Sequence, residues 1–106
     1  MQKDNNAIDI EVLFIPSESD IIKALHKCSG KGVVLNAGAY THTSLAIADA
    51  IAAIHIPVVE VHVSNTNNRA FYRKTSYISE QCIGSITGFG LHSYQLALHA
   101  LVHYLN

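Results

Sequence analysis

Short apolar stretches along this chain alternate with longer stretches in which apolar residues recur every three or four positions. The short stretches predict strands, and the longer ones predict amphipathic helices. The predicted strands cover residues 10–15, 32–35, 57–63 and 82–87. Such alternation favours a parallel sheet with helices packed on its faces, because each helix returns the chain to the end of the sheet where the next strand begins.

Three helices are expected between and after these strands. Ser17 can cap the first helix and Gly30 can end it. Its apolar stripe is Ile21, Ile22, Leu25 and Cys28. The second helix covers residues 45–54 and is apolar nearly all round apart from Asp49, so we expect it to be covered on several sides. The closing helix covers residues 91–105. Its apolar stripe is Leu91, Tyr94, Leu98, Leu101, Val102 and Leu105.

The composition is that of one globular domain, which we expect to cover residues 1–106, because 49% of the residues are hydrophobic and 14% are charged. A formal net charge of −1 argues against nucleic acid as a partner. No apolar run approaches the roughly 20 residues that span a bilayer, so no membrane partner is expected. Cys28 and Cys82 lack metal or redox spacing, and residues 1–6 do not resemble a signal peptide. These features predict a protein of the reducing cytoplasm.

Polar residues gather where the predicted strands end. Ligands of parallel α/β folds bind beyond the carboxyl ends of the strands, which here means residues 36–44, 62–73 and 88–91. The second of these segments begins a polar stretch, residues 64–81, that predicts at most a short helical turn. We therefore expect the functional site along this edge of the sheet.

Glu60 and His62 form the sharpest chemical pattern in the sequence. Side chains alternate across a strand, so these two residues share one face of the predicted strand 57–63. A carboxylate placed there can orient the imidazole and favour its protonated form, which suits a general acid. The alternative is a solvated pair at a sheet edge, against which the apolar neighbours on both sides argue.

The loop at residues 36–44 is a second candidate. Asn36 offers both a donor and an acceptor, His42 can bond a ligand hydroxyl, and Gly38 permits a tight turn. A helix begins just beyond, and its amino end favours negative charge. An ordinary capped loop with a surface histidine would have the same sequence, so the pattern leaves both interpretations open.

Further polar residues are weaker candidates. Arg69 and Arg73 stand four apart and suit a carboxylate or a polyhydroxy ligand, although a solvated charge cluster is the commoner explanation. Three histidines on the last helix, His92, His99 and His103, could include a metal pair, but they share a polar face, which favours solvent exposure. Asp49 would need a partner if it were buried.

Four of these stretches, in order and spacing, resemble the type II 3-dehydroquinate dehydratases. They are LNAGAYTHTSLAIAD at 35–49, VEVHVSN at 59–65, RAFYRKTSY at 69–77 and ITGFG at 86–90. The resemblance covers residues 8–105. It implies a flavodoxin-like, three-layer parallel sheet with helices on both faces. It also implies a lyase of the shikimate pathway, in aromatic amino-acid biosynthesis, which removes water from 3-dehydroquinate through an enolate, with no metal or organic cofactor.

The resemblance also assigns roles at the reacting centre. His62 would be the general acid that protonates the departing hydroxyl, and Glu60 would hold it. Asn36 would bind near that hydroxyl and help place the water that stabilises the enolate.

The remaining roles concern substrate binding and assembly. By the same resemblance, His42 and Arg73 would bind ring hydroxyls, and the backbone amides of Val63 and Ser64 would receive the carboxylate. Asp49 would reach the site of a neighbouring subunit in a dodecamer built from trimers.

The family's amino-terminal part is not found in this sequence. Members of the family begin with a strand and a Gly-Pro-Asn-Leu-Asn loop, followed by a lid that carries a catalytic Tyr and Arg, and then a helix. The family's first strand lies between the strands predicted here at 10–15 and 32–35. We therefore expect a truncated form with unpaired backbone at that place, and little turnover without the lid. Two rival hypotheses are a non-catalytic, ligand-binding or oligomer-forming remnant of the same fold and a flavodoxin-like binding or signalling module.

Overall fold

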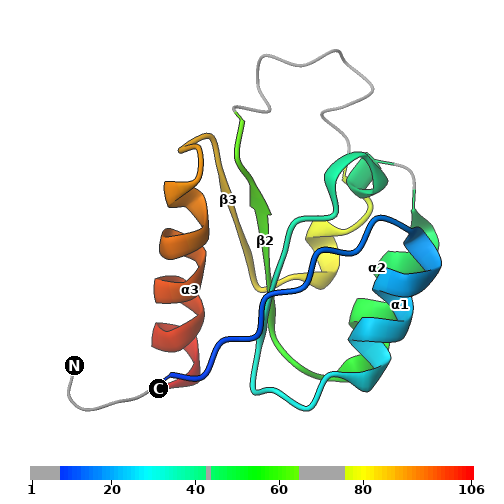
Figure 1. Cartoon of the computed structure of the whole chain (residues 1–106), viewed down its shortest axis with the longest axis horizontal. Helices are drawn as coiled ribbons and strands as arrows, with labels where there is room; N and C mark the ends of the chain where they lie inside the picture. Colours follow the sequence, from blue (N-terminus) through cyan, green and yellow to red (C-terminus); the bar gives the residue numbers. More distant parts are fainter. Residues whose placement is uncertain (1–7, 43, 65–75) are drawn as a thin grey trace.

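Three parallel strands form one sheet in the computed structural model, which describes residues 8–42, 44–64 and 76–106 (Figure 1). The strands are β1 (Val33–Leu35), β2 (Val58–His62) and β3 (Gly84–Thr87), side by side in that order. The long helices are α1 (Glu18–Lys27), α2 (Leu45–Ile54) and α3 (His92–Leu105). Among the described residues, two short 3₁₀ helices, η1 (Gly38–His42) and η4 (Ser79–Gln81), lie between them.

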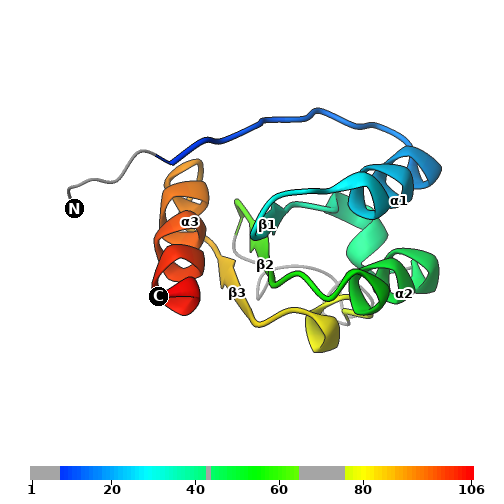
Figure 2. The ribbon, with the colours of Figure 1, turned by 90° about the horizontal axis from the view of Figure 1, so that it is seen from below.

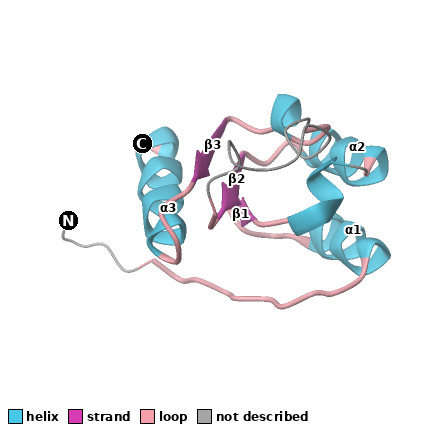
Figure 3. Cartoon of the chain, turned by 90° about the horizontal axis from the view of Figure 1, so that it is seen from above, coloured by secondary structure: helices cyan, strands magenta, loops and turns pink. Residues whose placement is uncertain are grey.

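The helices cover both faces of the sheet. Figures 2 and 3 show α1 and α2 together on one side and α3 alone on the other, so the predicted three-layer arrangement is confirmed. One hydrophobic core joins α1 and α2 to the sheet around Val58, and the second joins α3 to Val59 and Val61. No helix in the described parts of the chain is both long and apolar enough to cross a membrane.

Three of the four predicted strands form, each within two residues of its expected start. The prediction for residues 10–15 is wrong, because this segment is extended but pairs with no strand among the described residues. It runs outside the sheet from the side of α3 to α1 (Figure 2). Its apolar side chains lie largely in solvent, up to 93% exposed at Phe14. An apolar run forms a strand only where a neighbouring backbone accepts its hydrogen bonds.

Helix α1 begins as its sequence predicts and ends earlier. The Ser17 hydroxyl accepts a hydrogen bond from the Asp20 backbone N–H at 3.2 Å, which caps the first turn. The helix ends at Lys27 because Cys28 has extended backbone angles, so Gly30 does not supply its end. Ile21 and Leu25 are buried against α2, as their spacing indicates.

Helix α2 buries one face, and Asp49 is not on it. Ser44 caps the helix by accepting from the Ile47 backbone N–H, and His55 in the left-handed conformation ends it. The buried residues are Ile47, Ala48, Ala50 and Ile51. Asp49 is exposed, as is Leu45, so the expectation of cover on several sides is not met within this chain. The single charge therefore has water around it here.

Helix α3 packs on the predicted stripe only in part. Leu101 is buried as predicted, and Leu98 and Val102 are half-buried. Its buried residues are Ser93, Ala97 and Leu101, whereas Leu91 is 81% exposed. Small side chains let this helix lie close to the sheet. A Cβ atom at Gly32 would lie only 2.7 Å from a Leu101 methyl carbon, so the approach depends on that glycine. The predicted stripe thus contains the buried Leu101 but not Ser93 and Ala97, the two small residues that also pack.

Candidate active site

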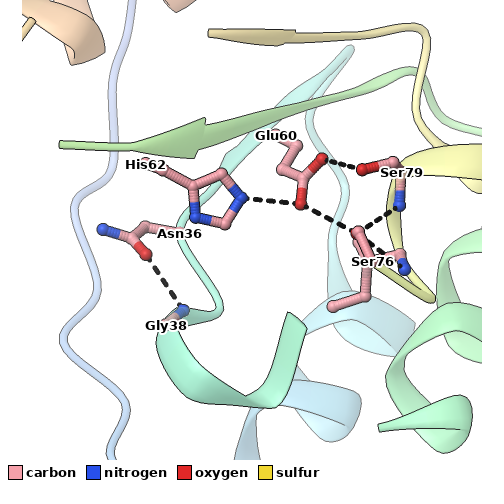
Figure 4. Close-up of polar contacts among 7 residues, drawn as sticks. Asn36, Gly38, Glu60, His62, Ser76 and Ser79 are labelled. Atoms are coloured by element: carbon pink, nitrogen blue, oxygen red, sulfur yellow. Dashed lines mark hydrogen bonds and ion pairs between the residues drawn. The ribbon is translucent and has the colours of Figure 1, made fainter. Parts of the chain in front are cut away.

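Strand β2 carries a buried carboxylate and a buried imidazole on one face. Glu60 is 1% exposed and His62 is 6% exposed, and the His62 Nε2 atom lies 2.7 Å from the Glu60 Oε2 atom. An ionised carboxylate only accepts hydrogen bonds, so Nε2 is the donor. The other ring nitrogen, Nδ1, lies on the side of the ring toward Asn36 (Figure 4). The prediction that these two residues share a face is confirmed.

Two serines from the segment before β3 bind the same carboxylate. The Ser79 hydroxyl donates to Glu60 Oε1 at 2.5 Å, and the Ser76 hydroxyl donates to Glu60 Oε2 at 3.3 Å (Figure 4). Ser76 Oγ also accepts from the backbone N–H groups of Ile78 and Ser79, at 3.2 Å and 3.0 Å. The short helix η4 thus begins at Ser79, whose side chain donates a hydrogen bond to the Glu60 carboxylate.

These donors decide the charge on Glu60. Burial on its own would raise the pKa of this carboxyl, but hydrogen bonds from His62 and Ser79, the charge of His62 and a further bond from Ser85 lower it below its usual value. The carboxylate is therefore ionised at neutral pH. Its negative charge and, more strongly, burial raise the pKa of the Cys82 thiol to about 12.

Asn36 is held at both ends of its amide. Its Oδ1 atom accepts from the Gly38 backbone N–H at 3.0 Å, and its Nδ2 atom donates to the Tyr94 hydroxyl at 2.9 Å. Gly38 has φ 59°, a conformation that favours glycine, and it starts the turn η1. An amide nitrogen has two N–H groups, and the second one has no acceptor among the described residues, so it can meet a ligand.

The loop after β3 is fastened to the end of β2. Gly88 N–H donates to the His62 carbonyl at 3.0 Å, and Gly90 N–H donates to the Val63 carbonyl at 2.8 Å. Both glycines have positive φ, 94° and 61°, which lets the backbone turn while making these bonds. Val63 is half-buried and Ser64 is exposed, directly beyond His62. The predicted backbone segment therefore lies at the expected edge of the sheet.

The structure brings together only some of the predicted site residues. Asn36, Glu60 and His62 lie together (Figure 4), whereas Asp49 is exposed on α2 and takes no part in this hydrogen-bonded group. Arg69 and Arg73 lie outside the described residues, as does the side chain of His42.

The histidines on α3 do not join the site. His92, His99 and His103 are exposed, as the polar face predicts. Within the described segments no three metal-binding side chains gather.

Sequence reasoning missed three residues of the site, Ser76, Ser79 and Tyr94. Two serines three positions apart before a predicted strand are typical of a capped turn, and nothing local indicates that their hydroxyls meet Glu60. The sequence pattern predicts Tyr94 in an apolar stripe. Its hydroxyl, however, reaches Asn36, 58 positions earlier in the chain.

A parallel α/β fold with a buried Glu–His pair and an oriented amide at the carboxyl ends of its strands defines a protein suited to acid–base chemistry. The family model described as "Dehydroquinase class II" matches residues 1–102. A 3-dehydroquinate dehydratase of an Exiguobacterium species is 57% identical over 99 residues, which is 91% of this chain and 68% of the relative. That of a Synechocystis species is 52% identical over 92 residues, 85% of this chain and 60% of the relative. The chain belongs to the class II dehydroquinase family.

Solved structures agree with this membership. A type II dehydroquinase from Propionibacterium acnes superposes with a TM-score of 0.84 at 37% identity, covering 91% of this chain and 68% of that one. The enzyme from Butyrivibrio crossotus gives a TM-score of 0.75 at 42% identity, covering 81% of this chain and 62% of that one. The fold is flavodoxin-like, as expected. The chain spans about two thirds of the length of these proteins.

Proposed function

We propose that this chain acts as a 3-dehydroquinate dehydratase, a lyase that removes water from 3-dehydroquinate to give 3-dehydroshikimate in the shikimate pathway. Its family membership and the names of its relatives support the proposal. The observation that carries it is the buried hydrogen bond from His62 Nε2 to Glu60 Oε2 at the end of β2. That arrangement suits a general acid whose partner stays ionised.

The proposed chemistry divides into two proton transfers. A base takes the proton from the carbon next to the ketone, which leaves an enolate, and the hydroxyl then departs as water after it receives a proton. In our proposal His62 supplies that second proton from Nδ1, because Nε2 is bonded to Glu60. The imidazole of His62 then becomes neutral, and its Nε2–H continues to donate a hydrogen bond to the Glu60 carboxylate.

Binding roles follow the same proposal. Asn36, whose amide is held by Gly38 and Tyr94, would bind near the departing hydroxyl. The backbone amides of Val63 and Ser64 would receive the substrate carboxylate. His42 and Arg73 would bind ring hydroxyls.

We also propose that residues 1–106 act as one domain in a cytoplasmic homo-oligomer, a dodecamer built from trimers. The exposed side of α2 supports an interface, because it presents apolar side chains around a single carboxylate. These residues are Leu45, Ala46, Asp49, Ala52 and Ala53. Cys28 and Cys82 are free thiols, in agreement with a reducing compartment.

Turnover, measured with the first strand and lid of a relative supplied as a peptide, tests the proposal directly, since the enone product absorbs in the ultraviolet. His62→Ala should lower kcat by about 10²–10⁴ while binding of dehydroquinate, measured by calorimetry, changes little. His99→Ala, which removes an exposed histidine on α3, is the matched control and should leave kcat unchanged. A His62→Ala protein within a few-fold of the parent would rule out the assigned acid. A parent protein that neither turns over nor binds dehydroquinate would overturn the function.

A further inference from the structure

Glu60 is an ionised carboxylate that is only 1% exposed, so its hydrogen bonds come mainly from the protein. A buried carboxylate without donors takes up a proton instead of staying ionised. His62 provides one donor, to Oε2. The other oxygen, Oε1, accepts from the Ser79 hydroxyl at 2.5 Å. Each of these two hydrogen bonds therefore holds a different oxygen of the carboxylate.

The two serines before β3 that bind Glu60 are not equivalent. Ser76 lies 3.3 Å from Oε2, and its Oγ atom already accepts from two backbone N–H groups, so it mainly caps the turn before η4. Ser79 is closer and binds Oε1, which His62 does not contact. Its own backbone N–H is fixed by Ser76, which orients the residue.

We propose that Ser79 is a positioning residue that acts through Glu60: its hydroxyl fixes the carboxylate so that Oε2 faces His62 Nε2 and Nδ1 is presented to the substrate. The inference rests on the proposed function for its catalytic consequence. The geometric part concerns only the state of Glu60 and holds for any ligand.

Loss of the Ser79 hydroxyl acts on both charge and geometry. The hydrogen bond from Ser79 is among the causes that lower the pKa of Glu60, against burial, which raises it. Without that bond the pKa of Glu60 rises, and the carboxylate can rotate about its side-chain bonds. A protonated or rotated Glu60 no longer holds the imidazole with Nδ1 toward Asn36, and proton transfer slows.

The acid titration of Glu60 can be measured without interference from other titratable groups near it. Within the described parts of the chain, the ones that interact with it are His62 on β2 and Cys82 after η4. The pKa of Cys82 is raised to about 12, so this thiol does not titrate in the acid range. A change in acid titration after substitution of Ser79 therefore reports the Glu60–His62 pair.

The experiment compares Ser79→Ala and Ser79→Thr with the parent, with Glu80→Gln as a control in the same turn. Carboxyl ¹³C NMR follows the titration of Glu60 in each folded protein. It should move to higher pH in Ser79→Ala and return toward the parent in Ser79→Thr, which keeps a hydroxyl. In dehydroquinate turnover, Ser79→Ala should lower kcat about 10- to 100-fold, move the acid limb of kcat to higher pH, and change KM less than threefold. Glu80→Gln should match the parent throughout.

The Glu60 titration in these variants decides whether Ser79 positions the carboxylate. A Glu60 titration that is unchanged in Ser79→Ala overturns the proposal, even if stability and kcat fall, because the role is then only structural. The NMR titration does not need turnover, so it still decides if dehydroquinate proves not to be the substrate. Should Ser79→Ala fail to fold, Ser79→Cys keeps the side-chain volume with a weak donor and should shift the titration in the same direction.

Discussion

The side-chain amide of Asn36 donates a hydrogen bond to the hydroxyl of Tyr94 at 2.9 Å, which joins the loop after β1 to the first turn of α3. The same amide accepts from the Gly38 backbone N–H through its oxygen. The Gly38 N–H in the loop after β1 therefore fixes the amide oxygen of Asn36, and Tyr94 on α3 fixes the amide nitrogen. The direction of the remaining N–H is set by elements from opposite faces of the sheet (Figure 3).

We expect Tyr94→Phe to lower kcat/KM for dehydroquinate about 3- to 10-fold, because one neutral hydrogen bond contributes about 0.5–1.5 kcal/mol. The thermal midpoint should change little, since Tyr94 is 39% exposed. Steady-state kinetics measure the effect. Tyr104→Phe is a matched control on the same helix, where the ring is 60% exposed. Equal kinetics for both variants would remove Tyr94 from the site.

The contact between Gly32 and Leu101 gives a prediction on stability. A Cβ at Gly32 would lie 2.7–2.9 Å from three carbon atoms of the buried Leu101 side chain, so Gly32→Ala should destabilise the fold by about 1–3 kcal/mol. Urea unfolding measures this change. Gly84→Ala is the control, because nothing lies within 4 Å of its added carbon. A Gly32→Ala protein as stable as the Gly84→Ala protein would contradict this account of the packing of α3.

The local pattern of the sequence predicts helices and strands well. It predicts poorly which residues far apart in the sequence contact each other. Ser17 and Ser44 cap helices because a cap needs only neighbouring residues. The Glu60–His62 pair was also predictable, since strand alternation alone places both on one face. The hydrogen bond from Ser79 to Glu60 joins residues 19 positions apart in the sequence. The polar sequence between them has no helical or strand periodicity, so no local pattern predicts this bond.

The same limit explains two of the departures from the predicted fold. Residues 10–15 have the composition of a strand, but strand formation depends on a partner that composition does not specify. In α3 the predicted stripe contains the buried Leu101 but not Ala97 and Ser93, whose small side chains permit a closer approach to the sheet. Both outcomes depend on neighbours that lie far away in the sequence.

Cys82 should be a poor nucleophile in the folded protein. With its pKa raised from 9.0 to about 12 by burial and by Glu60, the thiolate fraction at pH 8 is about a thousandfold lower than for an ordinary thiol. Alkylation by iodoacetamide, followed by mass spectrometry in a Cys28→Ser background, should be slow when folded and fast in urea. Glu60→Gln removes the smaller cause and should speed the folded reaction. Rapid alkylation of the folded parent would disprove this assignment.

Helix α2 gives a prediction on assembly. Its exposed side carries Leu45, 62% exposed, and Asp49, so we expect this face to be covered in an oligomer. Asp49→Leu should weaken the assembly, because a carboxylate in a mostly apolar interface needs a specific polar partner. Light scattering measures the mass, and Asp9→Leu at another exposed position serves as control. A monomeric parent at micromolar concentration would refute the oligomer itself.

The last prediction concerns residues 10–15, which are extended but unpaired, and β1, which ends the described sheet on that side. Ile10, Val12 and Phe14 are 59%, 68% and 93% exposed, an unfavourable state for apolar side chains. A parallel strand between this segment and β1 would bury them and satisfy both backbones. A peptide that carries the first strand and lid of a relative should therefore slow amide hydrogen exchange in residues 10–15 and in Val33–Leu35 at least tenfold, and raise dehydroquinate turnover. A scrambled peptide should do neither. Unchanged exchange at saturating peptide would mean that the edge of β1 accepts no strand in this chain, and that the apolar segment has another role.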